Sequence, residues 1–116
     1  MAELGTTNGI SSARVHVGEE DGTPVIRLVG EIDMMSAERI RPALDTALHC
    51  GAGRVVFDLA DVSFMDSSGL ALLVIAAKRV KVVELRHPSD PVRRVLELTG
   101  LAEILHVAPL AAIFPG

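Results

Sequence analysis

The sequence has no tryptophan, no tyrosine and only three phenylalanines among its 116 residues. Flat rings that stack on bases or sugars are therefore scarce, which argues against a platform for nucleic acid or carbohydrate. Cys50 is the only cysteine, so no internal disulfide can form, and we expect a reducing cytoplasm. The formal net charge of −4 also disfavours nucleic acid as a partner, because phosphates need a basic surface.

Long uncharged runs are missing as well. The longest, residues 67–77 and 104–116, are shorter than the roughly 20 residues of a membrane-spanning helix, and Pro109 interrupts the second. No basic segment followed by an apolar one opens the chain, so a secretory signal is not expected. We therefore expect no direct membrane insertion.

Sites for metals and cofactors also lack sequence support. No glycine-rich turn is followed by Lys and Ser or Thr, so a phosphate-binding P-loop is not predicted. The histidines are scattered without the spacing of metal ligands. They are His16, His49, His87 and His106. We predict no cofactor and no metal, and a hydrolase or metalloenzyme is only a third class of function.

Aliphatic residues are abundant. The chain is 49% hydrophobic with a mean hydropathy of +0.41. This composition suits a single domain with one aliphatic core, and it excludes disorder over the whole length. Residues 1–12 are polar without periodicity and predict a flexible leader, so the domain is expected over 13–116.

Runs of β-branched residues alternate with helical patterns in the order β-β-α-β-α-β-α-β. The expected strands are 14–17, 25–29, 54–59, 80–85 and 104–107, and the expected helices are 36–49, 70–77 and 91–99. Ser36 is predicted to cap the first helix and Asp90 the third, which Gly100 closes. The first two strands form an antiparallel hairpin and the helical crossovers are parallel, so the fold class is α/β with a mixed sheet.

The turn Asp66-Ser67-Ser68-Gly69 is the most informative local motif. It joins a strand to a helix, where free backbone N–H groups and the helix dipole favour an anion. A serine-hydrolase elbow would need glycine two residues before the nucleophile, and Met65 stands there instead. Two interpretations remain. Asp66 and Ser67 cap the helix, or a kinase partner adds a phosphate to Ser67 and places negative charge beside Asp66.

The helix that follows this turn is apolar on every side. Its expected core stripe consists of Leu70, Leu73, Val74 and Ala77. Either the helix is buried all round, or its outer residues, Leu72 and Ile75 among them, bind a partner.

Residues 55–70, VVFDLADVSFMDSSGL, resemble the signature of the STAS domain, and in particular that of the bacterial anti-sigma factor antagonists, or anti-anti-sigma factors. Three further stretches are similar to the family in the same order: VIRLVGEID at 25–33, RRVLELTGL at 93–101 and ILHV at 104–107. The resemblance implies a STAS-type mixed sheet of four to five strands with helices packed against it. Compared with the family, we expect a shortened second helix and a clipped C-terminal tail.

The resemblance implies a regulatory protein of the cytoplasm that is not itself an enzyme. In this family an anti-sigma factor with serine kinase activity binds the unphosphorylated antagonist and releases its sigma factor, as in stress response or sporulation. By carry-over, Ser67 is the phosphoacceptor, and Asp66, Ser68 and Gly69 shape the site around it. Phosphorylation dissociates the complex, and a PP2C-type phosphatase restores the unmodified form.

The same carry-over places Glu31 and Asp33 in a neighbouring loop that helps to contact the kinase, although a solvated loop end is the simpler reading. The alternative function is a non-switching STAS adaptor of a transport or signalling complex. In that case Ser67 is only a cap, and the apolar residues of 70–77 and 110–114 make a permanent contact. Apolar surface left uncovered by the short tail also leaves a weak homodimer open.

Overall fold

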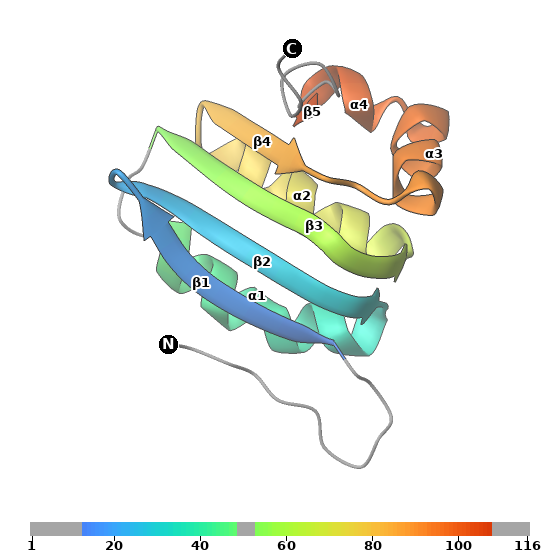
Figure 1. Ribbon diagram of the computed structural model, residues 1–116, viewed down its shortest axis with the longest axis horizontal. Helices are drawn as coiled ribbons and strands as arrows, with labels where there is room; N and C mark the ends of the chain where they lie inside the picture. The colour runs from blue at the N-terminus through green and yellow to red at the C-terminus, as the bar shows by residue number, and fades with distance from the viewer. Residues whose placement is uncertain (1–12, 49–52, 108–116) are drawn as a thin grey trace.

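The computed structural model describes residues 13–48 and 53–107. The strands are β1 (Arg14–Glu20), β2 (Thr23–Ile32), β3 (Arg54–Met65), β4 (Val82–Arg86) and β5 (His106–Val107), and the helices are α1 (Met34–Leu48), α2 (Ser67–Arg79), α3 (Asp90–Thr99) and α4 (Leu101–Ile104). The five strands form one sheet in chain order. Helices α1 and α2 lie side by side behind it, and α3 and α4 lie beyond β4 (Figure 1).

The sheet is mixed, as the sequence predicts. β1 pairs antiparallel with β2 across a tight turn at Asp21 and Gly22, whose φ angles of 50° and 84° are both left-handed. The pairs β2–β3, β3–β4 and β4–β5 are all parallel. The predicted fold class of α/β is therefore confirmed, with the parallel strands ending at one edge of the molecule.

The core between the sheet and its two helices is aliphatic, as the composition requires. Phe57 is the one aromatic ring among its largest fully buried side chains. The others are Ile26, Leu28, Ile32, Leu44, Leu59, Met65, Leu73, Leu85, Leu96, Leu105 and Val15. No helix in the described part of the chain is both long and apolar enough to cross a membrane.

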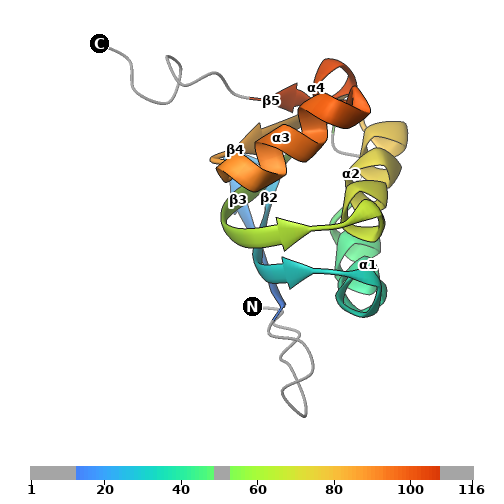
Figure 2. The same cartoon turned by 90° about the vertical axis from the view of Figure 1, so that its right-hand side faces the viewer.

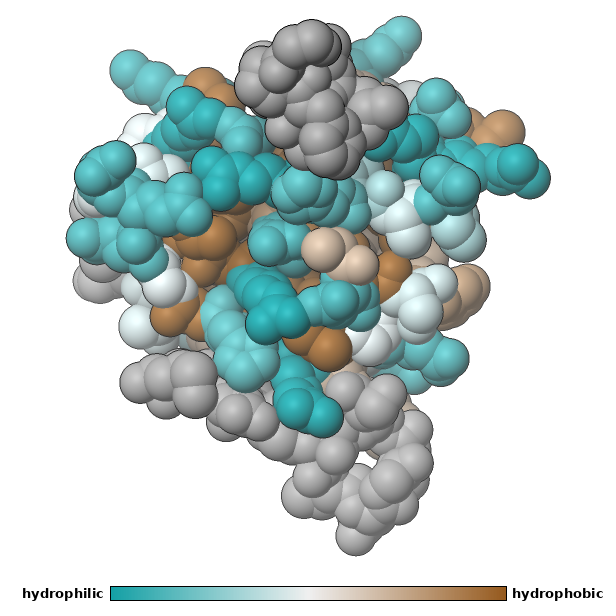
Figure 3. All heavy atoms as spheres, viewed as in Figure 1, coloured by the Kyte–Doolittle hydropathy of each residue, from teal (hydrophilic) through white to brown (hydrophobic). Residues whose placement is uncertain are grey.

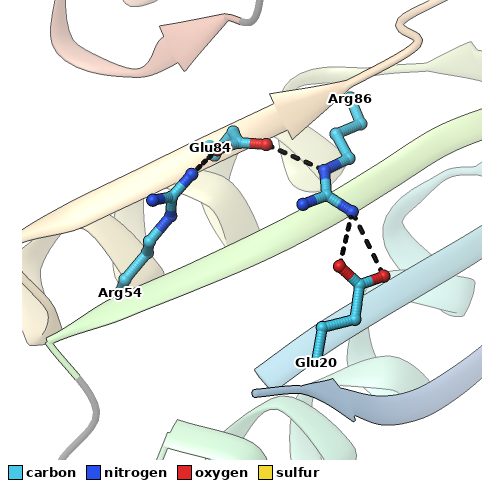
Figure 4. Close-up of polar contacts among 4 residues, drawn as sticks. All are labelled: Glu20, Arg54, Glu84 and Arg86. Carbon is cyan, nitrogen blue, oxygen red and sulfur yellow. Dashed lines mark hydrogen bonds and ion pairs between the residues drawn. The ribbon is translucent and has the colours of Figure 1, made fainter. Parts of the chain in front are cut away.

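The opposite face of the sheet carries charged side chains. Arg86 contacts Glu84 at 2.8 Å and Glu20 at 3.1 Å, and Arg54 also pairs with Glu84 (Figure 4). Val56 lies among these groups and is only 1% exposed, although no helix covers it. Hydrophilic side chains cross this face and hydrophobic atoms show between them (Figure 3). The stems of the charged residues thus replace a second helical layer.

Two elements near the Asp66 motif are longer than predicted. β3 continues to Met65 instead of ending at residue 59, because residues 61–65 pair with β2 after an irregularity in the register. α2 spans 13 residues, Ser67–Arg79, where only 70–77 was expected. Lys78 and Arg79 stand in its last turn, where positive charge suits the helix dipole. The expected eight-residue span for the second helix is therefore wrong.

The caps of two helices also differ from the prediction. Asp33 precedes α1 and accepts the Ser36 N–H, so Ser36 is not the cap. Ser89 caps α3, which places Asp90 inside the helix, whereas Gly100 closes it at φ 77° as expected. Helix α4 and the two-residue β5 replace a strand over 104–107. The leader 1–12, His49, Cys50 and the tail segment 110–114 lie outside the described residues.

Candidate functional site

Two strand-to-helix junctions lie side by side at the end of the sheet that faces the viewer in Figure 2. The first junction comprises residues 31–36, from the end of β2 into α1, and the second comprises residues 64–69, from β3 into α2. Ile32 and Met65 are register partners, and the Asp66 N–H donates to the Ile32 carbonyl at 3.1 Å. The structure therefore brings the predicted residues Glu31, Asp33 and 66–69 to one place.

Asp66 organises the second junction. Its backbone is extended, and its carboxylate Oδ1 accepts the N–H groups of Ser68 at 2.8 Å and Gly69 at 3.2 Å. Its carbonyl accepts the Leu70 N–H at 3.0 Å, which is the first bond of the helix. Asp66 is thus the N-cap of α2, and the cap needs no serine hydroxyl.

Ser67 is the first residue of α2, and its side chain is exposed. Its hydroxyl makes no hydrogen bond to any residue that the structure describes. Ser68, the next residue, is half-buried. A free hydroxyl at the positive end of a helix can accept a phosphoryl group without breaking an existing contact.

Gly69 allows the two junctions to approach. A Cβ atom at this position would overlap Cγ of Met65 and would lie 3.0 Å from Cγ2 of Ile32. Ile32 belongs to the first junction, so the missing side chain at Gly69 is what lets the two junctions pack closely. The role of Gly69 in shaping the site was predicted from the resemblance, and this geometry gives it a physical cause.

The first junction is closed by reciprocal hydrogen bonds between Asp33 and Ser36. The Asp33 carboxylate accepts the Ser36 N–H at 2.9 Å and its hydroxyl at 2.7 Å, while the Asp33 N–H donates to Ser36 Oγ at 2.8 Å. Ser36 is fully buried. The N–H of Ser36, and then its hydroxyl, hold the pKa of Asp33 below its ordinary value. Asp33 is thus engaged in positioning the loop.

Three exposed apolar side chains surround this end of the sheet. Met34 is 63% exposed, Met35 52% and Phe64 49%. The two methionines open α1, and Phe64 stands opposite exposed Glu31 in the register of β2 and β3. We call these three residues the apolar patch. The sequence does not predict this patch, because the pattern near the end of a strand or the start of a helix does not show which apolar residues stay exposed.

The partner-binding prediction for α2 needs correction. Leu72 is 3% exposed and belongs to the core, since α2 packs against α1 as well as against the sheet. Ile75 is half-buried, so its part in partner binding stays a prediction. Val74 and Ala77, expected in the core stripe, are half-buried too. The large apolar side chains that are exposed at the two junctions are therefore those of the apolar patch, and Leu72 is not among them.

The two sequence segments that contain the junctions are acidic, and the first is followed directly by Arg39. Residues 30–38 and 64–69 contain four acidic residues and no basic one. The acidic residues are Glu31, Asp33, Glu38 and Asp66. In the described part of the chain, no three His, Cys, Asp or Glu side chains gather closely enough to hold a metal ion. The two junctions therefore combine acidic residues, exposed apolar side chains and a Ser67 hydroxyl that bonds to no residue that the structure describes.

Comparisons with known proteins converge on one family. The STAS domain matches residues 14–112. The anti-sigma F factor antagonist of Lysinibacillus sphaericus is 36% identical over 84 residues, which cover 68% of this chain and 72% of that protein. The crystal structure of an anti-sigma factor antagonist from Mycobacterium paratuberculosis superposes with a TM-score of 0.77 at 28% identity, covering 89% of this chain and 91% of that one.

A third similar protein is known in a modified state. The structure of the Bacillus cell fate determinant SpoIIAA in its phosphorylated form has a TM-score of 0.61 to this chain at 28% identity. The superposition covers 82% of this chain and 91% of that one.

Proposed function

This chain belongs to the STAS domain family, and we propose that it is an anti-sigma factor antagonist controlled by a phosphate on Ser67. In the unphosphorylated form it binds an anti-sigma factor with serine kinase activity in the cytoplasm, and the sigma factor is released. The similar proteins from Lysinibacillus and Mycobacterium are named as anti-sigma factor antagonists, which supports the antagonist role. The observation that carries the proposal is the exposed hydroxyl of Ser67 at the start of α2, which bonds to none of the residues 13–48 and 53–107.

The structure of the site suits Ser67 as the acceptor. Ser36 is fully buried and its hydroxyl is engaged, so a kinase cannot reach it without opening the first junction. Ser67 Oγ would attack the γ-phosphorus of ATP while the bond to ADP breaks, and a base on the kinase takes the hydroxyl proton. Asp66 supports the transfer by keeping the helix start fixed through its two backbone hydrogen bonds.

A phosphate at this position would weaken docking for two reasons. It adds about −1.5 to −2 charges beside Asp66 and the exposed Glu31. It also brings a strongly hydrated group next to the apolar patch, which a partner would have to desolvate together with that charge. Neither effect requires the fold to change, so the switch acts through the surface.

The reverse step and the remaining contacts follow from the same arrangement. A PP2C-type phosphatase would hydrolyse the exposed phosphoserine, with water attacking phosphorus and Ser67 Oγ leaving. Glu31 is exposed and available for a direct contact with the kinase. Asp33 instead positions the loop through Ser36. Ile75 would contribute at the margin of the interface.

The test is phosphorylation by the anti-sigma factor kinases of the source organism, each purified and incubated with this protein and ATP. We expect one phosphate, located on Ser67 by peptide mass spectrometry, and none in Ser67→Ala. Ser63→Ala is the matched control, because Ser63 is an exposed serine of the neighbouring strand. Phosphorylation that persists in Ser67→Ala would contradict the assignment of the acceptor.

A further inference from the structure

The outer edge of the sheet is strand β1. Among the described residues β1 pairs with β2 alone, so one row of its backbone N–H and C=O groups points away from the sheet. Such an edge is a template for another strand unless it is blunted. β1 is seven residues long and contains no proline.

On its charged face the sequence of β1, RVHVGEE, is complementary to itself in the antiparallel direction, while on the other face Glu19 stands opposite Val15. When a second β1 is paired about Val17, Arg14 stands opposite Glu20 at both ends, and His16 stands opposite Gly18. Side chains two residues apart share a face of a strand, so these four lie together on the charged face of the sheet. No other symmetric pairing of this strand matches Arg14 with Glu20.

Arg14 and Glu20 are both able to form a further ion pair. Arg14 is exposed and has no ion-pair partner among the residues that the structure describes. The Glu20 side chain is 57% exposed and contacts Arg86 through a single nitrogen. A carboxylate can accept about four hydrogen bonds, so Glu20 can bind a second guanidinium while it keeps Arg86.

The shape of the face is also complementary. A hollow of about 290 Å³ lies over β1 and is lined by His16, Gly18, Glu20, Val25 and Arg27 among others. Gly18 leaves this part of the strand open, since a Cβ there would meet nothing within 4 Å. In the pairing about Val17, the imidazole of the second copy lies over this glycine. An aromatic ring beside a strand glycine is a recognised stabilising cross-strand pair.

We propose that a second copy of this chain docks on β1 and joins the two sheets through an antiparallel β1–β1 pair with two-fold symmetry. The interface consists of one strand from each copy, so the dimer is weak and forms only at high protein concentration. Ser67 lies at the start of α2 and not on β1, so it stays accessible in this dimer. The proposal therefore stands independently of the proposed phosphorylation.

The test is sedimentation velocity of the full chain over a concentration series in low-salt buffer. We expect a monomer–dimer equilibrium in the wild type. Arg14→Glu and Glu20→Arg each place like charges opposite each other twice, and we expect each to weaken dimerisation at least about tenfold. An equal mixture of the two variants restores opposite charges at both ends. The mixture should therefore form a heterodimer at concentrations where each variant alone is monomeric.

Two controls separate this interface from general effects of charge and folding. Arg86→Gln removes the contact of Glu20 within one copy and should leave dimerisation in place. Circular dichroism verifies that every variant is folded. A wild type that stays monomeric throughout the series overturns the proposal. So does a dimer that neither charge reversal weakens, or a mixture that behaves as the sum of two monomers.

Discussion

The two junctions are capped in the same way, but the serine is buried at the first and exposed at the second. Each begins with an aspartate, Asp33 or Asp66, whose carboxylate accepts backbone N–H groups of the helix that follows. At the first junction a serine stands three residues after the aspartate, and it is fully buried and bonded. At the second, Ser67 stands directly after the aspartate and is exposed.

The difference comes from the position of each serine in the first helical turn. Ser36, three residues past its cap, points back toward that cap and closes a reciprocal pair of hydrogen bonds. Ser67, at the first helical position, points away from the axis, and glycine takes the position three residues past Asp66. One serine is structural and the other is free to react, although both follow an aspartate at a helix start.

The largest loss of stability is expected from adding a side chain to the tightly packed second junction. Gly69→Ala should lower the free energy of unfolding by about 3 kcal/mol, because the added methyl group meets Met65 and Ile32. Alanine in an open helix position would instead be favourable. Urea denaturation measures the change, with Gly53→Ala as the matched control, since a Cβ at Gly53 meets nothing within 4 Å. Equal stability of the two variants would show that the junctions are not closely packed.

A smaller loss is expected when the first junction is opened. Ser36→Ala removes a fully buried hydroxyl and leaves the Asp33 N–H without its acceptor, so we expect a loss of about 2 kcal/mol of unfolding free energy. Ser63→Ala, on an exposed serine, should change stability by less than about 0.5 kcal/mol. Phosphorylation of Ser67 should continue in the folded Ser36→Ala protein, because the acceptor lies in the other junction.

The stability cost of Ser36→Ala should itself depend on pH. The Ser36 N–H, and then its hydroxyl, lower the pKa of Asp33 below its ordinary value of 3.8, so both favour the folded state while the carboxylate is ionised. Ser36→Ala keeps the N–H and removes only the contribution of the hydroxyl. That contribution is complete above the unfolded pKa and is lost as the pH falls below about 4. The difference between wild type and Ser36→Ala should therefore shrink on acidification, and a difference that is constant from neutral pH to pH 3 would contradict this origin.

The smallest effect concerns the surface between the junctions. Phe64→Ser should weaken binding of the anti-sigma factor about tenfold, or about 1.4 kcal/mol, because it removes half-exposed apolar area beside Ser67. Leu98→Ser is the control, since Leu98 is 80% exposed on α3 and outside the apolar patch. Isothermal titration calorimetry measures both. If the two variants bind equally well, the apolar patch is not part of the interface.

Local patterns were sufficient to predict the fold class and the presence of a helix after the Asp66 motif, but not the bounds of the strand and helix that meet there. Strands and helices alternate in the sequence, and the order of elements followed from that alternation. The Asp66-Ser67-Ser68-Gly69 turn combines a cap, a hydroxyl and a glycine within four adjacent residues, so its place at a helix start was visible. The contacts that cap α2 lie close together in the chain, since Asp66 accepts the N–H groups of Ser68 and Gly69.

Features that depend on distant contacts were not predictable. Leu72 looks like an outer residue by helical spacing, and only the packing of α1 against α2 buries it. Phe64 stands beside Glu31 only because the register of β2 and β3 brings these two residues together. Periodicity along one element contains no information about either arrangement.

The hydrogen bond from the Asp66 N–H to the Ile32 carbonyl has a consequence for how such proteins diverge. It is made by main-chain atoms only, so no substitution at either position, proline at residue 66 excepted, deletes a donor or an acceptor. Exposed side chains on either side of this bond, such as Glu31 and Phe64, can therefore change to suit a new partner while the main-chain spacing is kept. Related proteins can therefore acquire specificity for different partners at this surface without losing the ability to fold.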